Sequence, residues 1–265
     1  MRRHLVETSE GVLHFRSAGD LGADRVVLLF HQSPSSSRMW TGVMEALEQR
    51  GIASLAGDML DYGMSDRATS QLTVDTHARL LFDAANSIGK GRTVTVGHHT
   101  GAVFAASAAA QCEVDGLMIM GYPLYSSWRE KYERLGARIG PDRYGPDGAE
   151  LSELWVKLNS SIEPETAYED RHTILVDRLS AGPLWYTAYA ALLQADLEAT
   201  LRSAVETGVR ISSVFAHEDA ISQFEPGVSA VTTTDPIWID GGPWVTIEHP
   251  PRVADAIESF LGSLT

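Results

Sequence analysis

The stretch VTVGHHTGAVFAASAAAQ, residues 94–111, combines three local patterns that together decide the fold. Its first residues, 94–96, alternate valine and threonine, which is typical of a buried β-strand. Residues 101–111 are almost wholly small and apolar, which indicates a helix buried against a sheet. Between them lies a turn bounded by Gly97 and Gly101. A strand, a sharp turn and a helix in direct succession predict an α/β protein with His99 at the tip of the turn.

Short apolar runs and amphipathic helical patterns alternate along the rest of the chain. We expect strands at 26–30, 52–57, 92–97, 116–121, 210–216 and 236–240. The spacing of apolar residues predicts helices at 37–49, 73–87, 101–111 and 251–264. Continuous apolar strands belong in parallel sheets that helices cover on both faces. The fold class is therefore α/β, with a mostly parallel, doubly wound sheet, and residues 4–17 are expected to form an antiparallel hairpin at its edge.

Residues 124–204 interrupt this alternation, because they contain no convincing strand pattern. We interpret 124–204 as an inserted helical cap and 1–123 with 205–265 as the core. The segment is rich in aromatic residues, most of which are expected to form the cap's own core: Tyr125, Trp128, Tyr132, Tyr144, Trp155, Tyr168, Trp185, Tyr186 and Tyr189. A few of them, with Trp128 and Trp185 as candidates, are expected to line a cavity beneath the cap.

The composition excludes several classes of function. The chain has 265 residues and a formal charge of −14, which argues against nucleic-acid binding and against adhesion to anionic membranes. No apolar run approaches the roughly 20 residues needed to span a bilayer, and the first residues, MRRHLVETSEG, lack the apolar stretch of a signal peptide. Cys112 is the only cysteine, so an intrachain disulfide is excluded. We expect a soluble, cytoplasmic protein, and nothing in the sequence indicates an oligomer.

Four segments, in this order along the chain, resemble motifs of the α/β-hydrolase superfamily. Residues 29–34 (LFHQSP) look like the loop that supplies one backbone N–H of the oxyanion hole, and 58–66 (DMLDYGMSD) look like the loop after the next strand. Residues 97–101 (GHHTG) look like the nucleophile elbow, and 241–250 (GGPWVTIEHP) resemble the segment before the last helix. The resemblance covers the chain except the predicted cap, and it implies an α/β-hydrolase fold.

The same comparison reveals two departures from the family pattern. The elbow normally carries Ser, Asp or Cys, and here it carries His99; the position of the general base normally carries His, and here it carries Pro243. The segment AHED, 216–219, resembles the region that holds the acid, which implies that the acid is Asp219. Because an acyl-enzyme route needs both a nucleophile and its base, these departures rule out the usual chemistry through an elbow serine.

His99 is open to two interpretations. It is either the remnant of a triad that has lost its function or a reagent in its own right. The elbow holds its central residue at positive φ, which costs roughly 1–3 kcal/mol and persists where it serves a site. If Asp219 reaches the imidazole, the two residues form a base–acid pair without a serine. The backbone N–H groups of Ser33 and Thr100 are then expected to stabilise a developing oxyanion.

The remaining candidates have structural alternatives. We expect His98 to be structural and the ring of His31 to bond to neighbouring backbone. The alternative is that both rings, together with Gln32, line the site. His217 is close enough to Asp219 in sequence to be considered as a substitute base. A pattern such as His-x-Glu-x-x-His is absent, as are a phosphate loop and a dinucleotide fingerprint, so we predict neither a metal nor a cofactor.

Two functions from different classes follow. The first is an enzyme that acts on a small, largely apolar carbonyl compound, such as an ester, lactone or β-dicarbonyl. It uses His99 as general base with Asp219 and an oxyanion hole, for hydrolysis or for lyase-type cleavage. The alternative is a catalytically inactive protein of the same fold that binds a small apolar ligand.

Overall fold

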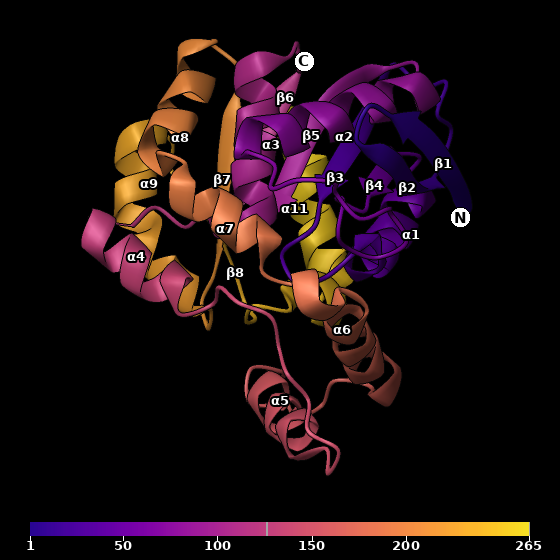
Figure 1. The fold of residues 1–265 in the computed structure, drawn as a ribbon. Coiled ribbons are helices and arrows are strands. Elements are labelled where there is room, and N and C mark those ends of the chain that lie inside the picture. The colour runs from indigo at the N-terminus through magenta and orange to yellow at the C-terminus, as the bar shows by residue number, and fades with distance from the viewer. Residues whose placement is uncertain (126, 265) are drawn as a thin grey trace.

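A computed structural model describes residues 1–125 and 127–264. Its eight-stranded sheet has the order β1-β2-β4-β3-β5-β6-β7-β8 (Figure 1). The strands are β1 (Arg2–Thr8), β2 (Gly11–Ala18), β3 (Arg25–Phe30), β4 (Ala53–Gly57), β5 (Arg92–His98), β6 (Gly116–Met120), β7 (Ile211–Ala216) and β8 (Ile237–Ile239). The hairpin β1–β2 is antiparallel, as is the pairing of β2 with β4, and all other pairs are parallel. The expected mostly parallel sheet with an edge hairpin is confirmed.

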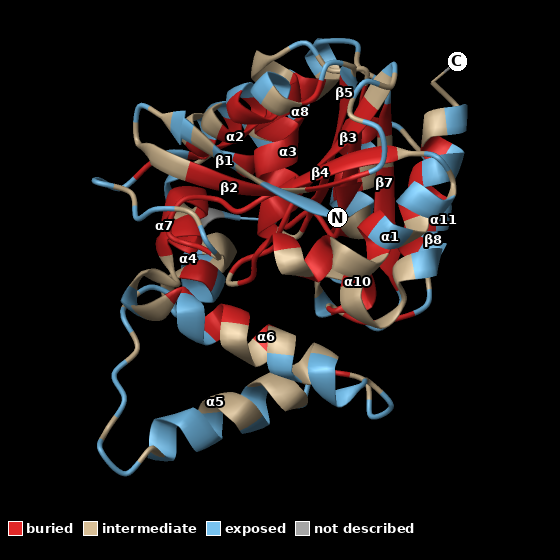
Figure 2. Ribbon diagram, turned by 90° about the vertical axis from the view of Figure 1, so that its right-hand side faces the viewer, coloured by how far each residue is buried: buried red, intermediate tan, exposed pale blue. Residues whose placement is uncertain are grey.

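Helices cover both faces of the sheet, as the continuous apolar strands predict. On one face α2 (Val74–Ile88), α3 (Thr100–Gln111) and α8 (Leu197–Glu206) build the larger core, and on the other α1 (Thr41–Gln49) and α11 (Pro250–Gly262) build a second. Strand β3 serves both cores, because Leu28 and Phe30 belong to the first and Val27 and Leu29 to the second. The buried layers lie between the helices and the sheet (Figure 2).

Within the described part of 124–204 the structure contains helices and no strand: α4 (Trp128–Gly136), α5 (Ala149–Asn159), α6 (Tyr168–Ser180), η2 (Gly182–Leu184), α7 (Thr187–Gln194) and most of α8. Helices α5 and α6 stand apart from the sheet at the bottom of Figure 1. Helix α8 instead packs on the sheet, since Leu201 and Ala204 lie in the same core as α3. The limits of the predicted cap stay a prediction, and its end at 204 falls inside α8.

The remaining elements are η1 (Ser37–Trp40), η3 (Ala220–Phe224), α9 (Glu225–Thr232) and α10 (Val245–Glu248). In the described residues, no helix has both the length and the apolar character that a membrane crossing requires. The loops after β3, β5 and β7 leave the sheet at one edge, the carboxyl edge, because these strands run parallel. Ligand sites in open α/β sheets form at that edge.

The turn from β5 into α3 is set by a very close approach of the first turn of α3 to β3. A Cβ atom on Gly101 would lie 2.3 Å from the carbonyl oxygen of Phe30, and one on Gly97 would lie 2.1 Å from the carbonyl oxygen of Gly101. This packing leaves no room for a gradual turn, and His99 between the two glycines has φ 51° and ψ −115°. The elbow conformation at His99 therefore follows from backbone packing on both sides of it.

We predict that Gly101→Ala destabilises the fold by about 2 kcal/mol or more, because the added methyl group must displace the backbone of β3. Urea unfolding measures the change in the free energy of unfolding. Gly136→Ala is the matched control, since a Cβ atom at this helical glycine meets its nearest neighbour at 3.8 Å. A Gly101→Ala protein as stable as the Gly136→Ala protein would contradict the packing described for the elbow.

Candidate active site

His99 and Asp219 meet at the carboxyl edge of the sheet. His99 follows β5 and Asp219 follows β7, with β6 between the two strands. The His99 Nε2 atom lies 2.5 Å from Asp219 Oδ2. Gly121, at the end of β6, makes this contact possible, because a Cβ atom there would lie 2.8 Å from Cδ2 of the His99 ring. The pairing expected from the sequence is thus present in the structure.

Asp219 is held as a carboxylate. Its burial raises the pKa, but the interaction and hydrogen bond with His99 and the hydrogen bond from the Ile221 N–H outweigh burial and lower the pKa to about 2. The Ile221 N–H donates to Oδ1 at 3.0 Å, and Asp219 caps η3. Because an ionised carboxylate only accepts hydrogen bonds, His99 must donate its Nε2–H to Asp219.

The other ring nitrogen of His99 is therefore the one that can take up a proton. The described residues offer no hydrogen-bond partner to His99 Nδ1, and this atom is not among the buried unpartnered ones. The side chain of His99 keeps 19% of its surface exposed, whereas that of Asp219 keeps 6%. A neutral imidazole oriented in this way presents an accessible lone pair on Nδ1.

His98 lies against the back of this pair. Its ring centroid is 4.1 Å from that of His99, at an interplanar angle of 32°. Burial lowers the pKa of His98 well below its usual value. The interaction with His99 lowers it further, and the charge of Asp219 raises it to a smaller extent. His98 is thus neutral, and its Nδ1 atom is buried without a partner. This burial agrees with the expected structural role.

His98, His99 and Asp219 also bring three possible metal ligands within 4.8 Å of one another. Their geometry fits a shared proton better than an ion. The 2.5 Å contact of His99 with Asp219 leaves no space for an ion between these two atoms. That these three residues bind no metal stays a prediction.

The loop after β3 reaches the elbow through Ser33 and Thr100. The Ser33 N–H, expected as an oxyanion donor, donates a hydrogen bond of 2.7 Å to Thr100 Oγ1. The Ser33 carbonyl accepts a hydrogen bond from the Tyr189 hydroxyl. The backbone N–H of Thr100 lies in the first turn of α3, where helix N–H groups have no acceptor within the helix. The hydroxyl of Thr100, which the sequence reasoning did not consider, thus stands between the two predicted donors.

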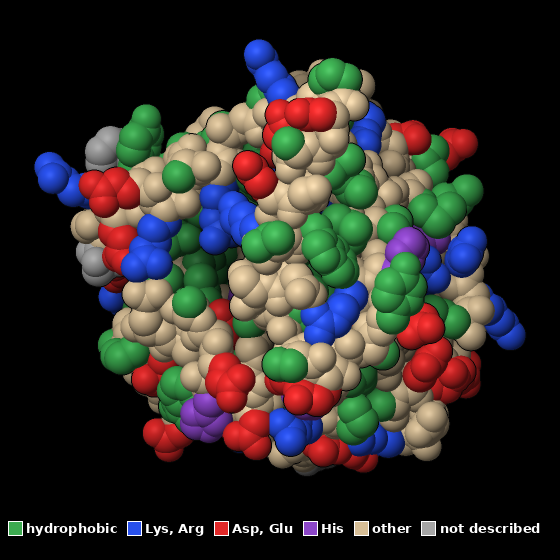
Figure 3. All heavy atoms as spheres, turned by 90° about the horizontal axis from the view of Figure 1, so that it is seen from below, with side chains coloured by type: hydrophobic (Ala, Val, Ile, Leu, Met, Phe, Trp, Pro, Cys, Tyr) green, Lys and Arg blue, Asp and Glu red, His purple; other side chains and the backbone are tan. Residues whose placement is uncertain are grey.

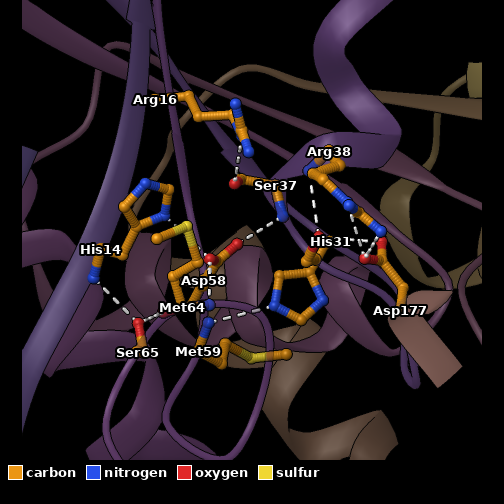
Figure 4. A network of polar contacts seen from close by, with 11 residues as sticks. His14, Arg16, His31, Ser37, Arg38, Asp58, Met59, Met64, Ser65 and Asp177 are labelled. Atoms are coloured by element: carbon orange, nitrogen blue, oxygen red, sulfur yellow. Dashed lines mark hydrogen bonds and ion pairs between the residues drawn. The ribbon is translucent and has the colours of Figure 1, made fainter. Parts of the chain in front are cut away.

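His31 is held by backbone groups on both sides of its ring, and Figure 4 shows its contact with Met59. Its Nδ1–H donates to the carbonyl oxygen of Gln32 at 2.8 Å, and its Nε2 accepts from the Met59 N–H at 3.0 Å. This confirms the expected bond to neighbouring backbone. Burial lowers the pKa of His31, so the ring is neutral. The side chain of Gln32 is buried beside it, and its backbone N–H donates to Met39 Sδ at 3.3 Å.

Two buried carboxylates that the sequence reasoning did not single out hold this loop in place (Figure 4). Asp58 accepts hydrogen bonds from the Ser37 N–H at 2.6 Å and from the ring of His14 at 2.9 Å. Asp177, from α6, accepts from Ser36 Oγ at 2.8 Å and pairs with Arg38 at 2.7 Å. Asp177 thereby ties the predicted cap to the oxyanion loop.

The last three candidates lie in different surroundings. The exposed ring of His217 stacks on Trp238 of β8, with centroids 5.0 Å apart, and so faces the sheet edge. Trp185 lies beneath the guanidinium of Arg178, 3.9 Å from its ring centroid. The side chain of Trp128 lies outside the described part of the chain. Whether these residues line the site stays a prediction.

Two surface cavities lie away from His99. One, of about 520 Å³, is at the amino ends of β7 and β8 beside Arg210 and Ile237, and one, of about 510 Å³, is beside Trp155 and Arg171. Figure 3 shows a hollow in the face seen from below, with Lys and Arg as well as Asp and Glu side chains around it.

The lowered pKa of Asp219 predicts a pH-dependent stability. A carboxyl whose pKa falls from 3.8 to about 2 on folding stabilises the fold above the unfolded value and loses this effect as the pH falls toward 2. The difference in unfolding free energy between the wild type and Asp219→Asn should shrink by about 2 kcal/mol from pH 5 to pH 2. Urea unfolding at a series of pH values measures it. A difference that does not change with pH would contradict the ionised pair.

Comparison with known proteins agrees with this fold. A sequence model of the alpha/beta hydrolase fold matches residues 25–138, whereas no curated protein matches the chain. A thermophilic esterase from Thermogutta terrifontis is 22% identical, with a TM-score of 0.77 over 100% of this chain and 99% of that one. An epoxide hydrolase from Vigna radiata is 17% identical (TM-score 0.74, 99% and 98%). An enol-lactonase from Burkholderia xenovorans LB400 is 15% identical (TM-score 0.70, 95% and 97%). The chain therefore has the α/β-hydrolase fold.

Proposed function

We propose that the protein is an enzyme that acts on a small carbonyl compound, such as an ester, a lactone or a β-dicarbonyl, with His99 as general base. The observation that carries this proposal is the 2.5 Å hydrogen bond from His99 Nε2 to Asp219, which orients the ring and leaves Nδ1 accessible. Solved structures of the same fold include an esterase, an epoxide hydrolase and an enol-lactonase, which supports a hydrolytic enzyme as one form of this proposal. We further propose that the substrate is largely apolar in its body and that the protein works in the cytoplasm.

The proposed chemistry needs no acyl-enzyme. The elbow carries His99 where the family normally has a nucleophile, so an imidazole stands where the attack would otherwise begin. In hydrolysis, Nδ1 takes a proton from a water molecule while the water oxygen bonds to the carbonyl carbon, and the imidazolium returns this proton to the leaving oxygen. In lyase-type cleavage, Nδ1 removes a proton from the carbon next to the carbonyl and an enolate forms. The enolate electrons then form a C=C bond as the bond to a leaving group on the β-carbon breaks, and the imidazolium returns its proton to that leaving group. Asp219 stabilises the imidazolium in both cases, as a buried carboxylate does in a triad.

Thr100 supports the proposal as a donor to the developing oxyanion. Its hydroxyl accepts the Ser33 N–H at 2.7 Å, so its own hydrogen is directed away from that loop. The described residues provide no acceptor for this hydrogen, and the side chain is buried at the elbow. Together with the backbone N–H of Thr100, the hydroxyl forms a two-donor oxyanion site in which Ser33 acts through Thr100. The Thr100 hydroxyl therefore takes the place of the Ser33 N–H, which the sequence predicts as the second donor.

The first test compares three variants on a panel of aryl esters, lactones and β-keto acids. His99→Ala is expected to lower kcat about 100-fold or more, because it removes the base. Asp219→Asn should also lower kcat, because the ring loses its orientation. His172→Ala is the control, and it should keep wild-type activity, since this exposed ring of α6 stacks on Tyr168.

Equal activity of the wild type, His99→Ala and Asp219→Asn on every substrate would overturn the mechanism. Saturable binding of the same compounds by the wild type without turnover would favour the alternative, an inactive protein of this fold that binds a small apolar ligand.

The second test separates the hydroxyl of Thr100 from its bulk. Thr100→Val keeps the shape and removes the donor, so kcat should fall by about 100-fold with little change in KM. Thr100→Ser keeps the hydroxyl and should retain most of the activity. If Thr100→Val were more active than the wild type, the hydroxyl would be a plug that competes with substrate for the Ser33 N–H.

A further inference from the structure

Arg178 of α6 and Trp185, just before α7, form a stacked pair with unused hydrogen-bond donors. The guanidinium carbon lies 3.9 Å from the centroid of the Trp185 ring. One terminal nitrogen of Arg178 pairs with Asp142, whereas the described residues offer no partner to the buried Nη1 atom. The Nε1–H of Trp185 is also buried without a partner among the described residues. Only 7% of the Arg178 side chain is exposed.

Two unpartnered donors in one stacked pair indicate a missing acceptor. A buried donor that lacks an acceptor costs free energy, and the cost is larger when the donor is charged. Stacking on an aromatic face stabilises the cation but uses none of its N–H groups. Asp142 pairs with Nη2 of the guanidinium only, so the N–H groups of Nη1 are left for another acceptor. A carboxylate, with two acceptor oxygens and a negative charge, matches a guanidinium N–H beside an indole N–H.

The pair is connected to the site at His99 by a short series of contacts. Trp185 packs edge-to-face on Tyr189, with centroids 5.8 Å apart, and the Tyr189 hydroxyl donates to the carbonyl oxygen of Ser33. Ser33 in turn donates to Thr100, the neighbour of His99. A second cation, Arg138, lies over the Tyr189 ring and donates to its hydroxyl at 3.4 Å. These residues place two guanidinium groups on the aromatic wall next to the oxyanion loop.

The negative overall charge of the protein bears on the role of Arg178 and Arg138. A chain with a formal charge of −14 repels an anionic ligand, so such a ligand needs a local positive site. Arg178 and Arg138, which lie over the rings of Trp185 and Tyr189, supply such positive charge beside the loop after β3.

We propose that Arg178 Nη1 and Trp185 Nε1 form a subsite for a carboxylate of the substrate, remote from the carbonyl on which His99 acts. The substrate class is then an acyl compound that carries a free carboxylate on its apolar body. The assignment of this carboxylate to a substrate rests on the proposed function, whereas carboxylate binding at the subsite does not. The subsite includes no covalent step, since it positions the ligand through hydrogen bonds and charge.

The test measures binding rather than turnover. Isothermal titration with 3-phenylpropionate and with its neutral amide, 3-phenylpropionamide, compares two ligands of the same shape at fixed ionic strength. The wild type should bind the acid about tenfold more tightly or better, as expected for a charge-assisted hydrogen bond. Arg178→Met should abolish this preference, and Trp185→Phe, which removes one N–H and keeps an aromatic ring, should reduce it. Arg143→Met, an exposed arginine next to Asp142, is the matched control and should keep the preference.

Equal binding of acid and amide by the wild type would overturn the subsite, and so would a preference that survives in Arg178→Met. If Arg178→Met does not fold, as circular dichroism would show, Trp185→Phe decides, and an unchanged preference there contradicts the two-donor site. The same titration in His99→Ala separates the two proposals. Normal acid binding by a His99→Ala protein that is still active would overturn the proposed function and leave the subsite in place.

Discussion

The close packing of the first turn of α3 against the end of β3 determines where the chemistry of this protein can occur. Gly97 and Gly101 have no room for a side chain, so the chain must reverse between them, and His99 takes the strained position at the tip. The same packing aligns the first N–H groups of α3 with the loop after β3. The imidazole of His99, the N–H and hydroxyl groups of Thr100 and the loop after β3 are thus brought together by one backbone contact.

The electrostatics around the elbow are consistent with a pair that shares one proton. Asp219 is buried and would be expected to become neutral, but His99 and a backbone N–H keep it ionised. Burial lowers the pKa of His98 well below its usual value, so this ring is neutral and adds no competing cation. The surrounding loops are fixed by Asp58 and Asp177, each of which accepts several hydrogen bonds. The result is a site in which the His99 ring is oriented by the protein before any ligand binds.

Much of the fold could be predicted from local sequence patterns. The strand at 92–97, the glycine-bounded turn and the small-residue helix at 101–111 depend on short-range patterns, and β5 and α3 differ from them by about one residue. Helix α8 is different: its pattern is helical like that of the neighbouring segment, and only its packing on α3 shows that it covers the sheet. Periodicity reports the type of an element, whereas the layer to which a helix belongs depends on tertiary contacts.

The site was predictable where a motif fixes the backbone and not where side chains meet across the fold. The pairing of His99 with Asp219 follows from two parallel strands that end at one edge. The contact of Thr100 with Ser33, the anchoring of Arg38 by Asp177 and the stack of Arg178 on Trp185 join distant or cap residues through rotamers. No local pattern encodes these contacts, because each side chain has an equally plausible exposed or capping role in the sequence.

The central claim is that His99 donates Nε2–H to Asp219 and keeps its lone pair on Nδ1. Nitrogen-15 NMR of the histidine side chains distinguishes the two ring nitrogens of the neutral imidazole, and His99→Ala assigns the signals. The account predicts a protonated Nε2 and an unprotonated Nδ1 for His99, with this preference weakened in Asp219→Asn. A proton on Nδ1 with the lone pair on Nε2 would contradict it, because the ring would then present no base to a substrate.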